Sequence, residues 1–267
     1  MKTLFWPVFL SMLSCHVVAQ GRPNGGPDGG EQQKPHWSLG VAAILKDSPY
    51  TGEGTRALPF PLISYQGENF YFRGGSAGWT FLRNESFEVT ALAKMHFGAF
   101  SVDDLGKEQL AKNGIDYRLL QDRESAADAG LEIKWEGNVG EIELKLLVDV
   151  TDTSGGQELS VQYAYPIPFA NGMLQPNISV NWLSKDNANY YYGTLDEEVA
   201  RGVVNYKPNA VIIPDIGLSY FRPINDKWSL MSSLTYSVLP DEITNSPLIE
   251  SGTDGTVSIF IGISRDF

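Results

Sequence analysis

Residues 87–97, FEVTALAKMHF, decide the fold, because their side chains alternate between apolar and mostly polar along the chain. Phe87, Val89 and Met95 fall on one side, and Glu88 and Lys94 fall on the other. A period of two residues is typical of a β-strand with one apolar and one polar face. Soluble β-sandwiches and membrane barrels both use such strands, so the choice between them rests on how the pattern recurs.

The same alternation recurs along the chain and predicts about twelve strands. Residues 127–136 and 139–151 form a predicted hairpin through the turn at Gly137 and Asn138. Stretches of about ten alternating residues with aromatic residues near their ends are typical of a lipid-facing barrel. The predicted strands are residues 37–45, 58–66, 69–75, 78–83, 86–97, 127–136, 139–151, 157–166, 172–183, 209–221, 227–239 and 256–267.

The lengths of the connections favour a barrel over a sandwich. With an even number of strands, the first strand begins and the last strand ends on the same side of the membrane, which is the periplasm. The long connections then share the outer face with two short ones at 76–77 and 152–156, and the inner face receives only short turns. The long connections are residues 46–57, 98–126, 184–208 and 240–255. The sequence therefore predicts an all-β, antiparallel, transmembrane up-and-down β-barrel in the bacterial outer membrane.

The first residues carry the pattern of a secretory signal peptide. Lys2 precedes an apolar run at residues 4–13, and small residues lead up to Ala19. We expect cleavage between Ala19 and Gln20. The predicted segments are a signal peptide at 1–19, a flexible Gly- and Pro-rich periplasmic leader at 20–36 and the barrel at 37–267.

Cys15 is the only cysteine of the sequence, and it leaves a second interpretation open. Cleavage after Ala19 removes it, which excludes disulfides, thiolate catalysis and cysteine-bound zinc in the mature chain. The alternative is a lipoprotein acylated on Cys15, although Met12 is a poor start for the motif that directs acylation.

The charge balance argues against a nucleic-acid partner. The chain has 20 Lys and Arg against 32 Asp and Glu, a formal net charge of -12, which repels phosphate. No apolar run approaches the roughly 18 residues that a helical membrane span needs. In a membrane this chain must therefore form a closed barrel, in which all backbone groups are paired.

The last predicted strand, residues 257–267, ends the sequence on an aromatic residue. Apolar side chains alternate along one of its faces, which is typical of the insertion signal read by the barrel-assembly machinery. Arg265 departs from that pattern, since its position is usually apolar or aromatic. The candidate insertion residues are Ile259, Ile261, Ile263 and Phe267.

Three longer strings resemble a known family. RESAADAGLEIKW at 123–135, GEIELKLLVDVTDTSGGQELSVQYAYPI at 140–167 and NYYYGTLDEEVARGVVNYKPNA at 189–210 are similar to the MipA/OmpV family, also called MltA-interacting proteins. The resemblance extends over residues 37–267. It implies a barrel without known catalytic residues, whose described role is to bring a lytic transglycosylase and a bifunctional murein synthase together.

From the resemblance we expect a non-enzymatic scaffold or interaction protein in the maintenance of the cell envelope and its peptidoglycan, without cofactor or metal. Its other partners are outer-membrane lipids and lipopolysaccharide, together with the barrel-assembly machinery during insertion. Other members look like adhesins or general outer-membrane proteins, so fold transfers better than function. A narrow channel for small solutes and a hydrolase active at the barrel rim are the alternative hypotheses.

A hydrolase would require a histidine beside a serine or an aspartate. His96 falls on the polar face of its strand, near Ser101 and Asp103 in sequence, whereas His36 lies in the leader. No second imidazole therefore assists, and we predict a lumen or rim histidine and no catalytic residue.

Three groups of side chains suggest contacts. Tyr190, Tyr191 and Tyr192 predict either a rim surface that contacts a partner or folds into the lumen, or a cluster that packs the loops. Acidic residues crowd two outer loops, where they are either solvated or bind divalent cations. These are Asp103, Asp104, Glu108, Asp116, Asp122, Glu124, Asp196, Glu197 and Glu198. Lumen-facing charges predict an internal salt-bridge network, or else a pore lining. These are Glu132, Lys134, Glu136, Glu141, Glu143 and Lys145.

Overall fold

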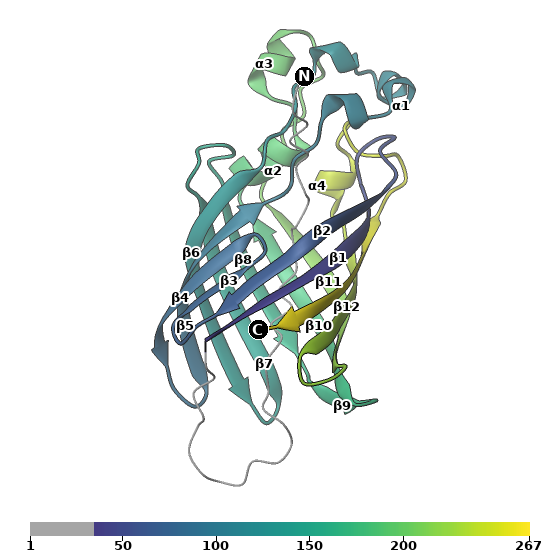
Figure 1. The fold of residues 1–267 in the computed structure, drawn as a ribbon. Coiled ribbons are helices and arrows are strands. Elements are labelled where there is room, and N and C mark those ends of the chain that lie inside the picture. The colour runs from purple at the N-terminus through teal and green to yellow at the C-terminus, as the bar shows by residue number, and fades with distance from the viewer. Residues whose placement is uncertain (1–34) are drawn as a thin grey trace, which may run out of the picture.

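The structure, a computed structural model, describes residues 35–267. The predicted signal peptide, its cleavage site at Ala19 and Gln20 and nearly all of the predicted leader lie outside these residues. The described chain forms a closed antiparallel barrel with helices gathered at one end (Figure 1). Its strands are β1 His36–Asp47, β2 Thr55–Gln66, β3 Phe70–Arg73, β4 Ser76–Arg83, β5 Phe87–His96, β6 Ala126–Gly137, β7 Gly140–Asp149, β8 Gln157–Ala164, β9 Ile167–Phe169, β10 Gly172–Leu183, β11 Val211–Pro223, β12 Trp228–Val238 and β13 Gly255–Asp266.

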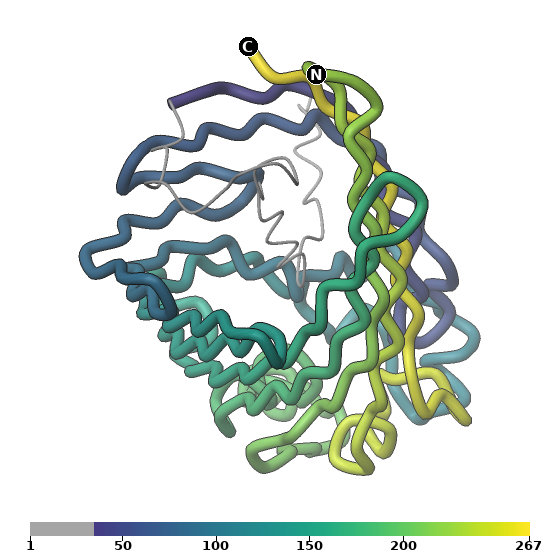
Figure 2. Tube along the Cα trace, turned by 90° about the horizontal axis from the view of Figure 1, so that it is seen from below, coloured from purple at the N-terminus to yellow at the C-terminus, as the bar shows by residue number. Residues whose placement is uncertain are grey.

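Twelve of these strands make the wall, which confirms the predicted fold class and strand number. Each wall strand pairs with its neighbours in sequence, and β13 returns to pair with β1 from Asp266 opposite Ser38 to Ser258 opposite Lys46. Seen from below, the strands form a ring (Figure 2). β1 begins and β13 ends at the same end of the barrel, opposite the helices (Figure 1).

The two faces of the wall differ as the alternation predicts. Outward-facing apolar side chains are exposed to the membrane, among them Val41 at 64% and Ile216 at 60% of their surface. Inward-facing polar side chains such as Thr90 and Asn181 are buried. Lipid on one side and a packed lumen on the other explain this sorting, because successive side chains of a strand point to opposite faces.

The inner wall also has an apolar part. Ala42, Ile44 and Phe260 from β1 and β13 form a buried cluster inside the barrel, and Phe60 and Leu62 from β2 pack against it. The lumen therefore has one apolar side, and the charged residues of β6 and β7 lie elsewhere on the wall.

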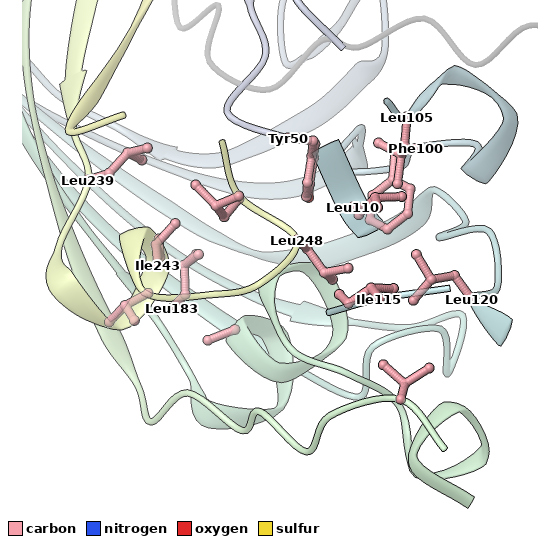
Figure 3. Close-up of a cluster of buried hydrophobic side chains, with 14 of the residues drawn as sticks. Tyr50, Phe100, Leu105, Leu110, Ile115, Leu120, Leu183, Leu239, Ile243 and Leu248 are labelled. Atoms are coloured by element: carbon pink, nitrogen blue, oxygen red, sulfur yellow. The ribbon is translucent and has the colours of Figure 1, made fainter. Parts of the chain in front are cut away.

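The helices lie in the outer loops and form a lid over the barrel (Figure 1). They enclose the largest cluster of buried apolar side chains, including Leu110, Ile243 and Leu248 (Figure 3). The helices are the 3-10 helices η1 Val102–Asp104 and η2 Tyr117–Leu119, and the α-helices α1 Lys107–Lys112, α2 Lys185–Tyr192, α3 Asp196–Ala200 and α4 Asp241–Thr244. Among the described residues, none of the helices has the length and apolar character needed to span a membrane.

Two predicted turns were wrong, and β2 begins three residues before the predicted start at 58. The connection at 76–77 is instead a turn at Gly74 and Gly75, because Gly74 adopts a φ of 56°, a conformation that glycine accepts readily. The inner turn predicted at 167–171 contains the short strand β9, which pairs with the start of β10. Ala170 and Asn171 form its tight turn, with φ of 47° and 61°.

Closure of the barrel requires a glycine at position 40. A Cβ there would lie 2.0 Å from the carbonyl oxygen of Ile263 on β13. We expect Gly40→Ala to shift backbone at the β1–β13 seam and to lower the free energy of unfolding by about 1–3 kcal/mol. Urea titration, read by the slower gel migration of the unfolded barrel, measures the change.

Gly262→Ala is the matched control on the same seam. Its Cβ would meet side-chain atoms only, Cδ1 of Leu62 at 2.9 Å, the Phe260 ring at 3.0 Å and Cβ of Ala42 at 3.2 Å, so it should lower the unfolding midpoint less than Gly40→Ala does. Equal midpoints for Gly40→Ala and the parent would contradict the close approach of the two strands.

Candidate functional site

A buried ion pair joins the outer loops of the lid. Arg123 donates from Nη1 to Oε1 of Glu198 at 2.8 Å and from Nη2 to Oε2 at 2.9 Å, and both side chains are fully buried. The guanidinium also donates to the carbonyl oxygens of Tyr190, at 2.6 Å, and Gln121, at 2.8 Å. A bidentate pair with its remaining donors satisfied fixes orientation strongly, so this arginine ties the loop after β5 to the loop after β10.

The three tyrosines of α2 fasten the lid to the barrel mouth. Tyr191 is 2% exposed and stacks on His96, with ring centroids 4.6 Å apart. Its carbonyl oxygen accepts from the hydroxyl of Tyr50 at 3.1 Å, and the hydroxyl of Tyr190 accepts from the backbone N–H of Glu124 at 2.9 Å. These contacts agree with the loop-packing interpretation and leave the buried Tyr191 no surface for a protein partner.

A small cavity of about 90 Å³ lies below α2. Its lining includes Tyr50, Lys94, His96, Asn187 and Tyr191. Within the described part of the chain, the hydroxyl of Tyr191 and Oδ1 of Asn187 are buried without a hydrogen-bond partner. Two unsatisfied polar atoms in one cavity are unusual in a folded protein and are suited to binding a small polar group.

Burial keeps the tyrosines of the lid protonated. It raises the pKa of Tyr192 to about 12, and the pKa values of Tyr50 and Tyr191 also lie above the ordinary value because burial disfavours the phenolate. At physiological pH these hydroxyls are therefore hydrogen-bond donors.

His96 belongs to a charged cluster at the floor of the cavity. Its Nδ1 lies 3.2 Å from Oδ2 of Asp128 and 3.8 Å from Oε2 of Glu158. These three side chains offer one histidine nitrogen and two carboxylate oxygens within 4.8 Å of one another, ligand types that zinc accepts. Lys94 already brings a positive charge to the cluster, with Nζ 3.5 Å from Oε1 of Glu158.

The serine of the hydrolase hypothesis lies elsewhere. Ser101 donates to Asp122 at 3.3 Å, and Asp122 also accepts from the backbone N–H of Val102 at 2.7 Å. The contacts of Ser101 are thus within its own loop, whereas His96 contacts the acidic cluster. This geometry gives the hydrolase hypothesis no nucleophile from the predicted residue.

The lumen-facing charges form the predicted internal network. Lys145 contacts Glu143 and lies 3.4 Å from Glu132. Lys134 lies 2.5 Å from Glu136 and 3.7 Å from Glu141, across to the next strand. Opposite charges on neighbouring strands thus neutralise one another inside the barrel.

Several acidic residues of the outer loops have partners within the chain. Asp104 pairs with Arg56 at 2.9 Å, and Asp196 pairs with Lys207 at 2.8 Å. The exposed Asp116 is 2.8 Å from Arg118, and this neighbour lowers the pKa of the Asp116 carboxyl. Cation binding by these loops stays a prediction.

The candidate insertion residues lie on the outer side of the wall. Ile259, Ile261 and Ile263 sit between β12 and β1. The N–H of Phe267 donates to the carbonyl oxygen of Trp37 at 2.9 Å, and the guanidinium of Arg265 lies 4.9 Å from the Phe267 ring. Their role in insertion stays a prediction.

Sequence reasoning did not identify the Arg123–Glu198 pair or the unsatisfied Asn187. The two ends of the ion pair are 75 residues apart. No signal in the sequence singles out Arg123, because its loop also contains Lys107, Lys112 and Arg118.

Comparison with known proteins gives concordant matches. A family model described as MltA-interacting protein MipA matches residues 39–267. The MltA-interacting protein of Escherichia coli K12 is 30% identical over 232 residues, covering 86% of this chain and 90% of the relative. The putative outer membrane protein YiaT of the same strain is 30% identical over 217 residues, covering 80% and 84%.

More distant proteins also match. OmpV of Vibrio cholerae is 25% identical over 138 residues, which cover 52% of this chain and 54% of that protein. Among solved structures, an outer membrane channel from Pseudomonas putida F1 aligns with a TM-score of 0.47 and 10% identity, covering 90% of this chain and 99% of the other.

Removing the buried ion pair should loosen the lid and leave the wall intact. We expect Arg123→Ala to destabilise the lid by about 3–5 kcal/mol, because it strands the carboxylate of Glu198 in the interior. Limited proteolysis of the folded barrel should then cut within residues 98–125 or 193–210.

Arg118→Ala, which removes an exposed pair, is the matched control and should leave the proteolysis rate unchanged. A lid as resistant in Arg123→Ala as in the control would show that the ion pair does not hold it.

Proposed function

The chain belongs to the MltA-interacting protein family of outer-membrane proteins, and from this premise we propose that it is a non-enzymatic scaffold, which holds a lytic transglycosylase at the inner surface of the outer membrane. Its location in the outer membrane follows from the family and the fold. The enzyme partner rests on the name of the Escherichia coli relative. A murein synthase as second partner rests on the family resemblance alone.

The lid is the observation that carries the proposal. Its apolar cluster and the buried Arg123–Glu198 pair close the outer end of the barrel, and ion pairs between neighbouring strands, such as Lys145–Glu132, neutralise charges on the inner wall. A conducting pore needs a water-filled path, whereas a scaffold needs only a rigid frame in the membrane. The closed end therefore supports the scaffold over the narrow channel.

The β9 hairpin offers a surface for the partner at the periplasmic end. It projects below the wall, and Phe169 is 57% exposed at its tip (Figure 1). The Phe169 ring lies 6.3 Å from that of Tyr220, whose hydroxyl donates to the carbonyl oxygen of Ala170 at 3.0 Å. An exposed aromatic on a braced hairpin has the character of an interaction hot spot.

Retention of the partner tests this surface. With the barrel immobilised through its outer face, we expect a purified lytic transglycosylase to be retained and Phe169→Ser to weaken its binding about tenfold, as loss of about 1.4 kcal/mol would do. Glu197→Gln, exposed on the lid at the opposite end, is the control and should bind as the parent does. Equal binding by the parent and both variants would show that the hairpin is not part of the interface. Absence of binding by the parent would show that a lytic transglycosylase is not a partner.

Planar bilayers separate the scaffold from the channel. The folded protein should give no discrete conductance steps, because the lid closes one end of the barrel. Regular steps in the parent protein would favour the channel. Hydrolysis of lipid or peptide that is lost in His96→Ala would instead favour the rim hydrolase.

A further inference from the structure

The barrel wall has a gap in its hydrogen bonding next to β2. β2 pairs with β1 along its whole length, but on its other side it meets β3 only through Ser64, Tyr65 and Gln66. The β3–β4 hairpin turns at Gly74, whose N–H donates to the carbonyl oxygen of Ile63 at 3.2 Å. Above this point, in the part of the chain that the structure describes, no strand pairs with residues 55–62 on that side.

The sequence of β2 is adapted to this gap. Because Ile63 directs its carbonyl toward β3, the alternation of a strand directs the backbone of Ala57, Pro59 and Pro61 to the same side. Proline has no N–H, so two of these positions have no donor to leave unpaired. The same prolines disfavour an added peptide strand, which would need those donors.

The gap reaches the apolar belt of the barrel. Pro61 lies opposite Val41, and Val41 lies opposite Ile263, both of which face the membrane. Open sheet edges are not tolerated against hydrocarbon, so the free carbonyl groups of β2 require water or a ligand beside them.

The cavity below α2 lies directly behind the gap. It is lined by Arg56 and Leu58 from β2 on one side and by Lys94 and His96 from β5 on the other. The top of the gap is closed by the Arg56–Asp104 ion pair, at 2.9 Å. Gap and cavity together form a lateral window, bounded by β2, the turn at 74–75, the end of β5 and η1.

The polar atoms in the cavity favour an acceptor-rich ligand. Tyr191 contributes an unsatisfied hydroxyl donor, and Lys94 contributes a cationic donor 3.5 Å from Glu158. Arg56, in contrast, is already paired with both Glu53 and Asp104, and Oδ1 of Asn187 is an unsatisfied acceptor. A carboxylate accepts from several such donors at once. The cavity that receives this head has a volume of about 90 Å³.

We propose that the lateral window is a binding site for a single-chain amphiphile with a carboxylate head, which enters from the outer leaflet. The head binds below α2 at Tyr191 and Lys94, and the chain passes between β2 and β5 into the membrane. This site is independent of a periplasmic partner.

A photoreactive fatty acid tests the site. The probe is a 12-carbon fatty acid with a diazirine beside the carboxylate, added to the protein folded in phospholipid vesicles. We expect crosslinks at residues 56–58 and 94–98, located by mass spectrometry and competed by laurate. Labelling confined to outward-facing residues such as Val41 would overturn the proposal.

Two variants and two probes sharpen the result. Tyr191→Phe removes only the unsatisfied hydroxyl and should reduce window labelling about fivefold, whereas the outward-facing Tyr236→Phe should not. Leu58→Trp, which fills the entrance, should abolish it, with folding verified by gel mobility. The reference is the labelling of the window in the parent protein by the fatty-acid probe. Equal labelling by an amine of the same length or by a diazirine phospholipid would contradict the carboxylate site, and so would equal labelling of Tyr191→Phe by the fatty acid.

Discussion

The constraint on which the whole structure depends is that the backbone must be hydrogen-bonded wherever it meets hydrocarbon. Pairing of β1 with β13 satisfies it by closing the sheet, and close approach at Gly40 makes that pairing possible. Once the sheet closes, the alternation of each strand fixes which side chains face lipid and which face the lumen. Within residues 35–267, the one long stretch that departs from the rule is the upper part of β2, which carries prolines at two of the positions where a donor would be unpaired.

The lid is stabilised in a different way, because it lies in water over the open end of the barrel. An apolar cluster and the buried Arg123–Glu198 pair hold it together, as in a small soluble domain. Tyr191, stacked on His96, connects this domain to the charged inner wall. Function can therefore be divided between a closed outer end, a cavity below it and an inner end that carries the projecting β9 hairpin.

The wall could be predicted from the sequence because period-two patterning is local: residues 87–97 alone indicate a strand and its two faces. The lid could not, because its contacts join residues that are far apart, such as Arg123 and Glu198, and loops have no repeating pattern. The turn at Gly74 was misplaced by two residues, and this small shift conceals the shortness of β3. The tyrosines of α2 were selected as candidates, but the sequence left open whether they face outward or pack inward.

The central claim is that the lid closes the outer end of the barrel, and the accessibility of the lumen tests it most directly. A cysteine placed at Ser179, which faces the lumen on β10, can be reacted in intact cells with a membrane-impermeant maleimide. The account predicts slow reaction in the parent chain and fast reaction when Arg123→Ala is added. Reaction of the parent as fast as that of a cysteine on the exposed lid would show that the barrel is open to the outside and would contradict the account.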